Sequence, residues 1–254
     1  MLTLAEVEDD AYFAMRAAQM DMLETERLGV THVSDVVSPC MRNVIYKKIL
    51  PSVGASTEDV KSLLYGQAIH KTTILGKKEH NELFLAYNWV RDEVITEEEA
   101  KKIPADDPKQ LDIIYGTIDD LRQVKGEWII CDKKTTGAID YFKKDRTGAS
   151  DQHKAQINVY RVLLKKCYDI DAKFGCDIYL SNQVSKETRD GIYPKAFKLN
   201  PIEDTLTNMI EKAKFLKAAL QKKLLPERTK CFLCNGMCPY ATKCFKDERE
   251  SFAD

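Results

Sequence analysis

Stretches with helical and strand-like patterns of apolar residues alternate along the chain. Apolar periodicity and capping signals predict helices over residues 3–28, 57–77, 151–168 and 201–225. β-Branched and aromatic residues dominate the stretches that predict strands, over residues 82–95, 111–134, 173–182 and 192–199. Because the helices and strands do not alternate regularly, this order predicts a mixed α/β (α+β) fold rather than a series of βαβ units.

Turn and capping residues set several boundaries of these elements. Residues 124–127 (Val-Lys-Gly-Glu) predict a tight turn that joins two strands into a hairpin. Asn200 is the predicted N-cap of the last long helix, with Pro201 at its first position and an end near Leu225. The polar stretch over residues 96–109 predicts a connector between the first two strands.

The composition is typical of a folded chain with an ordinary hydrophobic core. Of the 254 residues, 44% are hydrophobic and 31% are charged, and the formal net charge is −1. These values exclude a disordered chain and argue against a uniformly basic nucleic-acid binder. No apolar stretch is long enough to cross a membrane and the N-terminus is acidic, so we expect a soluble, cytoplasmic protein without a membrane partner.

The near-neutral total is the sum of two segments of opposite charge. Residues 92–120 contain ten acidic residues and three lysines, a balance of −7. Residues 195–246 contain eleven Lys or Arg and four acidic residues, a balance of +7. Lysines on an exposed helix often serve only solvation, but together they also offer a surface for phosphate groups. The distribution of charge therefore allows a metal-binding acidic region and a phosphate-binding basic one.

Two predicted strands carry carboxylates that the hairpin turn would bring together. Asp119 lies near the end of an apolar run, and Asp132 and Lys134 lie two residues apart on the next strand. Because strand side chains alternate between faces, Asp132 and Lys134 share one face. Two neighbouring carboxylates repel unless a cation neutralises them, and hard oxygen ligands suit Mg²⁺ or Mn²⁺. A simple salt bridge to Lys134 is the alternative.

These residues belong to a longer ordered set of motifs. A G-x-x-x-H pattern ending at His70 comes first, followed by G-x-x-D ending at Asp119 and then by the D-x-K of Asp132. A Q-x-x-x-Y pattern follows, with Gln156 and Tyr160 one helical turn apart on a single face. The ordered set resembles the RecB-like branch of the PD-(D/E)XK nucleases.

The resemblance implies a fold and a role for each motif residue. The fold is a restriction-endonuclease-like core, in which helices flank a central mixed β-sheet. In this family His70, Asp119 and Asp132 would hold the catalytic metal ion. Lys134 would orient or deprotonate the attacking water, and Gln156 with Tyr160 would position DNA near the site. General chemistry supports these roles, because a divalent ion lowers the pKa of bound water and stabilises charge on the scissile phosphate.

Seven of the eight cysteines fall into two groups along the chain, and Cys40 stands apart near its start. Cys131, Cys167 and Cys176 lie in apolar surroundings and are predicted to be core thiols. Four others crowd into the C-terminal tail: Cys231, Cys234, Cys238 and Cys244. Four local thiolates are able to form a tetrahedral zinc site, which is one interpretation of this tail.

The other interpretation brings in Cys40, near the start of the chain. RecB-like nucleases of the CRISPR-associated Cas four family, and related AddB-type and phage exonucleases, have one cysteine before the nuclease motifs and three after them. The segments around Cys40 and Cys244 resemble this arrangement, which implies a [4Fe–4S] cluster. Its ligands would be Cys40, Cys234, Cys238 and Cys244, with Cys231 as the alternative to Cys234.

The sequence therefore predicts a metal-dependent DNA exonuclease that prefers single-stranded ends. Its partners would be DNA and either CRISPR integration proteins or recombination and repair proteins. A catalytically silent DNA-binding scaffold and a zinc-binding interaction module are the alternatives. Three segments are predicted: an acidic helical extension (1–33), a RecB-like nuclease domain (34–230) and a cysteine-rich tail (231–254) that completes the cluster with Cys40.

Overall fold

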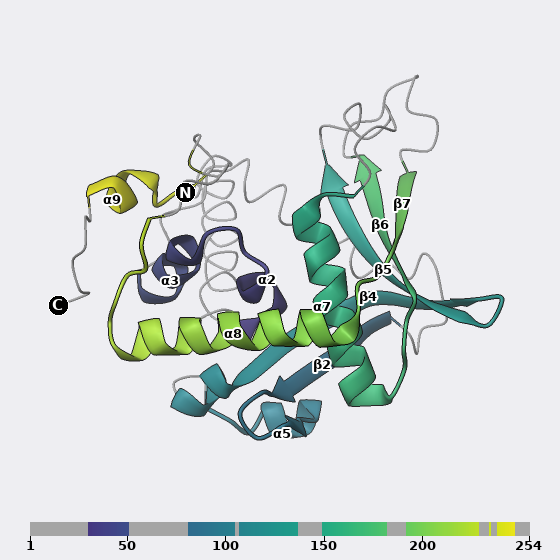
Figure 1. Ribbon diagram of the computed structural model, residues 1–254, viewed down its shortest axis with the longest axis horizontal. Helices are drawn as coiled ribbons and strands as arrows, with labels where there is room; N and C mark the ends of the chain where they lie inside the picture. Colours follow the sequence, from purple (N-terminus) through teal and green to yellow (C-terminus); the bar gives the residue numbers. More distant parts are fainter. Residues whose placement is uncertain are drawn as a thin grey trace, which may run out of the picture.

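A computed structural model gives the arrangement of the chain (Figure 1). It describes residues 30–50, 81–104, 107–136, 149–181, 192–228, 234 and 238–246. The helices predicted over residues 3–28 and 57–77 lie outside the described residues, and so do His70 and Cys231. The boundaries of the three predicted segments stay a prediction.

The described strands form one mixed sheet in the order β3-β2-β4-β5-β6-β7, and β1 pairs with β4. β1 with β4 and β5 with β6 are parallel, whereas the other pairs are antiparallel. The strands are β1 (Thr31–His32), β2 (Asn81–Asn88), β3 (Glu93–Val94), β4 (Ile113–Val124), β5 (Glu127–Thr136), β6 (Phe174–Ser181) and β7 (Ile192–Lys198).

Strand β4 changes partners along one of its edges. Its other edge pairs with β2 from Ile113 to Asp120. On the changing edge, β4 pairs with β1 as far as Tyr115 and with β5 only from Asp120 onward. Residues 116–119 therefore lie between the two pairings, at a place that we call the β4 fork.

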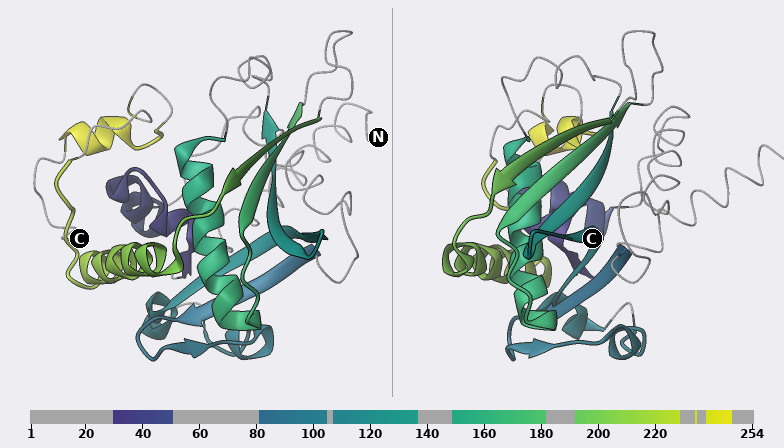
Figure 2. Two further views of the ribbon diagram at one scale, coloured as in Figure 1. Left: turned by 45° about the vertical axis from the view of Figure 1, so that its right-hand side comes forward. Right: turned by 90° about the vertical axis from the view of Figure 1, so that its right-hand side faces the viewer.

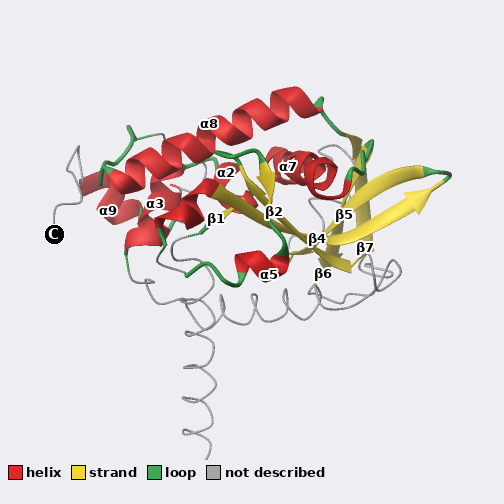
Figure 3. Ribbon diagram, turned by 90° about the horizontal axis from the view of Figure 1, so that it is seen from below, coloured by secondary structure: helices red, strands yellow, loops and turns green. Residues whose placement is uncertain are grey.

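Helices flank the sheet, as predicted. α7 (Asp151–Tyr168) packs against one face, and α8 (Ile202–Gln221) covers the far side of α7 (Figure 3). α5 (Glu97–Ala100) lies on the opposite side of the sheet from α8. The remaining described helices are α2 (Val33–Val36), α3 (Met41–Ile49), the 3-10 helix η2 (Pro108–Asp112) and α9 (Ala241–Lys246). None of these helices combines the length and the apolar character needed to cross a membrane.

The main hydrophobic core lies between the sheet and α7. Fully buried side chains from β2, β4 and β5 meet those of α7, including Leu85, Ile114, Ile118, Ile130, Ile157 and Leu163. The thiols predicted for the core are buried or half-buried: Cys167 packs against this core, and Cys131 and Cys176 pack together on β5 and β6. Burial of these apolar surfaces is what fixes α7 on the sheet.

The predicted hairpin turn is confirmed by its backbone. Lys125 and Gly126 have φ angles of 51° and 86°, and the strands on either side pair directly. Two consecutive left-handed residues are typical of the tight turn whose twist matches that of an antiparallel pair.

Of the two long helices, α7 matches its predicted limits and α8 does not. Ser150 Oγ caps the start of α7 by accepting a hydrogen bond from the N–H of His153, and Asp169 ends the helix with a left-handed backbone. The predicted start of α8 is wrong by one residue, since Pro201 and not Asn200 is the N-cap. The backbone N–H of Asn200 instead donates to Asn158 Oδ1 at 2.7 Å. α8 also ends at Gln221, before the predicted Leu225.

The polar connector contains more regular structure than the sequence suggested. Thr96 caps α5 through a reciprocal pair of hydrogen bonds with Glu99, which is a capping box. η2 follows, and the buried Gln110 within it donates to the carbonyl of Ile103 at 3.0 Å. These contacts give a strongly acidic segment a defined backbone over one end of the sheet.

Candidate functional site

The β4–β5 hairpin brings Asp119 and Asp132 to the β4 fork. Both residues are buried, with 7% and 2% of their surface exposed. Asp119 Oδ2 accepts a hydrogen bond of 2.6 Å from the backbone N–H of Lys133, which fixes this carboxylate against β5. The hairpin register therefore places the two carboxylates side by side, as expected.

Lys134 projects toward the same face of β5 as Asp132. Its Nζ lies 2.6 Å from Asp132 Oδ2 and donates to Gln156 Oε1 at 3.1 Å. Burial works to lower the pKa of Lys134, but the charge of Asp132, with those of Asp119 and Asp177, raises it above its ordinary value. Lys134 is therefore a charged ammonium group in the protein without bound ions.

Helix α7 supplies the other two members of the group. Gln156 Nε2 donates to Tyr160 Oη at 2.9 Å and lies 3.5 Å from Asp132 Oδ1. Burial first, and the charge of Asp132 second, raise the pKa of Tyr160, so its hydroxyl stays protonated. We call these five residues the carboxylate site: Asp119, Asp132, Lys134, Gln156 and Tyr160.

The structure thus brings five of the six predicted motif residues together. The sixth, His70, lies outside the described residues. Their metal-binding and catalytic roles stay predictions. Among the residues that the structure describes, no three His, Cys, Asp or Glu side chains are arranged to hold a metal ion by themselves.

A third carboxylate, Asp177, lies beside the carboxylate site and is absent from the motif set. It is fully buried on β6, directly in register with Asp132. Burial first, and the neighbouring Asp132 second, raise the pKa of Asp177 to about 7, although Lys134 opposes the shift. The signal in the sequence is an aspartate inside the apolar strand segment Phe-Gly-Cys-Asp-Ile-Tyr-Leu.

Asp177 is linked to α7 through an aromatic hydroxyl. Tyr179 Oη lies 2.9 Å from His153 Nδ1 and 3.4 Å from Asp177 Oδ2. Burial and the positive charge of Lys134 lower the pKa of His153 to about 4, so its ring is neutral at pH 7. Asp177 Oδ1 has no hydrogen-bond partner among the described residues.

The N-terminal and C-terminal cysteine segments lie side by side (Figure 2). Cys40 is buried at the start of α3, and the next two residues reach the tail. Arg42 Nη1 approaches Cys244 Sγ at 3.7 Å and donates to the Cys244 carbonyl at 3.2 Å. Asn43 Nδ2 donates to Cys238 Sγ at 3.1 Å.

These contacts fit a sulfur site that is shared between the two ends of the chain. Donors aimed at sulfur stabilise thiolates, which are the form that binds metal clusters. Tyr46 of α3 also stacks on Tyr240 of the tail, with ring centroids 5.6 Å apart. Cys234 is described only as an isolated residue, and Cys231 lies outside the described residues, so the choice between them stays open.

Part of the predicted basic surface on α8 is engaged within the protein. Lys217 forms an ion pair with Asp112 and lies over the ring of Trp89, with its Nζ 5.8 Å from the ring centroid. Partial burial lowers the pKa of Lys212. Lys217 therefore braces η2 against α8, whereas Lys214 and Lys222 are exposed to solvent.

Comparison with known proteins gives similarity in structure but not in sequence. No family model and no curated protein matches the chain. The solved structure titled SSO0001 is similar, with a TM-score of 0.55 and 15% identity over 91% of this chain and 95% of that one. At this identity, the similarity establishes a shared fold.

More distant similarity is found to an alkaline exonuclease, LHK-Exo, from Laribacter hongkongensis. It has a TM-score of 0.42 and 11% identity over 79% of this chain and 94% of that one. A second structure, titled LHK-Exo in complex with dAMP, gives a TM-score of 0.40 and 11% identity over 77% of this chain and 89% of that one.

Proposed function

We propose that this protein is a metal-dependent deoxyribonuclease that degrades DNA from single-stranded ends. The observation that carries the proposal is the convergence of Asp119, Asp132 and Lys134 with Gln156 and Tyr160 of α7. Residues of three separate sequence motifs, G-x-x-D, D-x-K and Q-x-x-x-Y, thus lie together in one buried place. A surface salt bridge, the alternative for an isolated D-x-K motif, does not account for two further buried motifs beside it.

The donor atoms of the site fit a hard divalent cation. Asp119 and Asp132 would hold Mg²⁺ or Mn²⁺, with His70 as the further ligand that the family resemblance implies. The buried Oδ1 of Asp177 has no hydrogen-bond partner among the described residues, and three buried carboxyls close together favour a cation between them. When bound, the ion would lower the pKa of a water molecule and stabilise charge on the phosphate.

The charge state of Lys134 in the metal-free protein favours one of its two predicted roles. Because nearby carboxylates raise its pKa, Lys134 carries a proton there, which supports the orienting role over that of a base. Its ammonium group instead orients the nucleophile and places positive charge where the phosphate becomes more negative. The hydrogen bond from Lys134 to Gln156 Oε1 fixes the direction of this group.

Hydrolysis of end-labelled single-stranded DNA with Mn²⁺ or Mg²⁺ tests the proposal. Asp132→Asn and Lys134→Ala should each lower the rate by at least about a hundredfold, since each removes charge stabilisation from the site. Lys166→Ala is the matched control, because Lys166 also pairs with an aspartate, Asp92, but lies on the surface. Equal activity in all four proteins would exclude the proposed site.

We also propose that a [4Fe–4S] cluster joins the two ends of the chain through Cys40, Cys234, Cys238 and Cys244. The hydrogen bonds from Arg42 and Asn43 to the tail support this ligand set over a zinc site formed within the tail alone. When present, the cluster would serve a structural role, because it closes a long loop of chain.

Iron content and visible absorbance of the purified protein test the ligand set. Cys40→Ser should lose iron and the brown colour of the cluster, whereas Cys167→Ser should keep both, because Cys167 packs against the main core. A colourless wild-type protein that contains zinc would favour the local zinc site. CRISPR integration proteins and recombination proteins stay predicted partners.

A further inference from the structure

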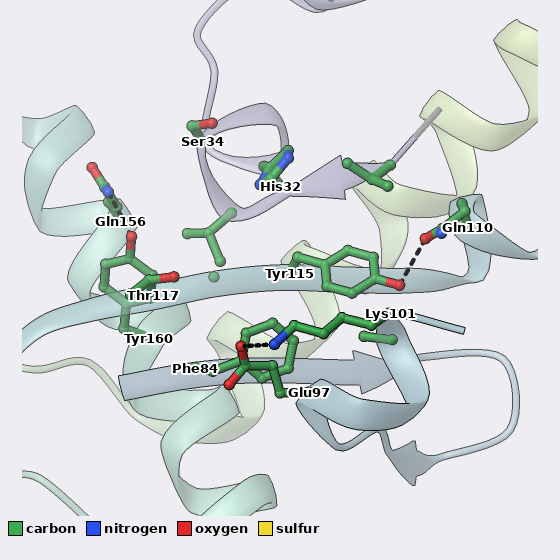
Figure 4. Close-up of a pocket in the computed structure, with 14 residues that line it drawn as sticks. His32, Ser34, Phe84, Glu97, Lys101, Gln110, Tyr115, Thr117, Gln156 and Tyr160 are labelled. Carbon is green, nitrogen blue, oxygen red and sulfur yellow. Dashed lines mark hydrogen bonds and ion pairs between the residues drawn. The ribbon is translucent and has the colours of Figure 1, made fainter. Parts of the chain in front are cut away.

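A groove leads away from the carboxylate site along the β4 fork. It encloses a cavity of about 760 Å³, and Gln156 and Tyr160 form one end of its wall. The other walls come from β1, α2, β2, α5, η2 and β4 (Figure 4). Its volume lies in the range of roughly 300–1,000 Å³ that is typical of small-ligand sites. Because β1 ends its pairing at Tyr115, the groove opens where β4 lacks a partner strand.

Three aromatic side chains from three different strands line the groove. The ring centroids of His32 and Phe84 lie 6.4 Å and 6.3 Å from that of Tyr115, with interplanar angles of 49° and 54°. Figure 4 shows the Tyr115 ring between the other two. We call these residues the aromatic trio. Tyr115 itself is buried, whereas His32 and Phe84 are half-buried, so these two rings contribute the aromatic surface of the groove.

The central member of the trio is held in a fixed orientation. Tyr115 Oη donates a hydrogen bond of 2.7 Å to Gln110 Oε1, and the amide nitrogen of Gln110 donates to Ile103. Burial raises the pKa of Tyr115 to about 12, so its hydroxyl keeps the proton that it donates. The capped connector between β3 and β4 therefore serves to orient the ring.

The rest of the groove is polar. Ser34 and Thr117 are exposed at its sides, and Gln156 lies at the carboxylate end. An exposed ion pair of 2.7 Å between Lys101 and Glu97 lies along α5. An occupant with a flat apolar face and hydrogen-bonding edges matches both parts of this lining.

We propose that the groove binds an unpaired base of a single DNA strand against the half-buried rings of the aromatic trio, His32 and Phe84, beside the phosphate on which the carboxylate site would act. The inference rests on the proposed function and adds a substrate subsite to it. Aromatic side chains stack on any base, so the groove accepts the strand without reading its sequence. A base inside duplex DNA has its faces and pairing edge occupied, so the groove selects single strands.

Binding of two matched probes to the intact protein, in EDTA to prevent hydrolysis, tests the inference. One probe is a fluorescent oligothymidylate of about ten nucleotides, and the other is a fully abasic strand of the same length. Both probes have the same phosphates, so only base contacts distinguish them. We expect the wild-type protein to bind the thymidylate strand about tenfold more tightly by fluorescence anisotropy.

Two variants and a control locate the contact. His32→Ala and Phe84→Ala should each weaken binding of the thymidylate strand by about fivefold to tenfold and leave the abasic strand unaffected. Phe215→Ala removes an exposed ring on α8, outside the groove, and should change neither affinity. Thermal denaturation of each variant identifies any loss of folding, and His32→Ala carries the test if Phe84→Ala unfolds.

The outcomes separate this inference from the proposed function. Equal wild-type affinity for the two probes, or equal weakening of both probes by the His32 and Phe84 variants, would overturn the inference even if the protein hydrolyses DNA. Base-dependent binding that requires His32 and Phe84 would support it even in a protein that hydrolyses nothing.

Discussion

Gly116, the glycine of the G-x-x-D motif, is required by packing rather than by a turn. A Cβ atom added there would lie 2.8 Å from Tyr160 Cε1 and 2.8 Å from Val33 Cγ2, closer than side chains approach one another. The tyrosine of one motif therefore rests on the glycine of another. This contact between β4 and α7 explains why position 116 is a glycine.

Gly116→Ala should lower the free energy of unfolding by about 1–3 kcal/mol, because the added methyl group overpacks a filled space. It should also move Tyr160 and so reduce DNA hydrolysis. Urea denaturation measures the first effect, and the hydrolysis assay measures the second. Thr117→Ala, at the exposed neighbouring position, is the control and should leave the free energy of unfolding nearly unchanged. Equal stability of the two variants would contradict the packing explanation.

The raised pKa of Asp177 predicts that this residue contributes less to the stability of the protein as the pH rises toward 7. Its pKa is about 7 in the folded protein against an ordinary value of 3.8, so the folded state binds this proton more tightly than the unfolded state. Stability contributed by the protonated carboxyl is present below about pH 4 and is lost as the pH rises to about 7. The slope of this loss should reach at most about 1.4 kcal/mol per pH unit.

Asp177→Asn removes the titrating group and keeps its size. The difference in unfolding free energy between the wild type and this variant, measured in urea without divalent ions, should shift in favour of the variant from pH 4 to pH 7. His153 remains in both proteins and contributes with the opposite sign, so its effect largely cancels in the comparison. Parallel pH profiles would show that Asp177 does not retain its proton.

Single residues of the site differ in how far the sequence alone predicts them. The two-residue spacing of Asp132 and Lys134 was enough to place them on one face, since strand side chains alternate. Asp177 was missed because its approach to Asp132 depends on parallel pairing of β5 with β6, strands that are separated by α7 in the chain. No pattern of neighbouring residues in the sequence indicates which residues of these two strands pair.

At the scale of elements, α7 holds the site in place, and its first turn is set by one hydroxyl. Ser150→Ala should destabilise the protein by about 1 kcal/mol, because the N–H of His153 loses its acceptor. Ser150→Asp keeps a good capping group and should restore most of the loss. Chemical denaturation of the three proteins provides the measurement, and an alanine variant as stable as the wild type would exclude a role for the cap.

Elements defined by local signals were predicted well, and those defined by distant contacts were not. The turn at Lys125 and the limits of α7 depend on neighbouring residues and match the prediction. The start of α8 was displaced because Asn158, on another helix, binds the backbone of Asn200. The mixed α/β class followed from the order of elements and the central sheet with flanking helices from the family resemblance, whereas the change of partners along β4 followed from neither.

Over the whole molecule, Arg42 ties the beginning of the described chain to its end. Its Nε donates to the Pro226 carbonyl at 2.6 Å, and its Nη1 donates to the Cys244 carbonyl. Arg42→Ala should release the tail and speed its cleavage in limited proteolysis, because two carbonyls lose a buried donor. Arg42→Lys should give an intermediate rate, since a lysine cannot reproduce both directions of the guanidinium group. An unchanged rate in Arg42→Ala would show that other contacts retain the tail.

The approach of the two chain ends could not be predicted from local pattern or composition. Cys40 was assigned to the tail cysteines only by family resemblance, and the contacts of Arg42 and Asn43 with the tail are properties of the folded chain. The net charge was equally uninformative, because ion pairs such as Lys217 with Asp112 join the oppositely charged segments within the fold.

The β4 fork gives the sheet two arms that belong to different parts of the molecule. One arm is β1, which leads at once through α2 to Cys40 and the tail, and the other is β5 with Asp132 and Lys134. We therefore expect a displacement of the cysteine region to reach β1 through α2, and with it the residues of β4 beside Asp119. Substitution of a tail cysteine should thus disturb the carboxylate site through the backbone, rather than through a contact of that cysteine with Asp132.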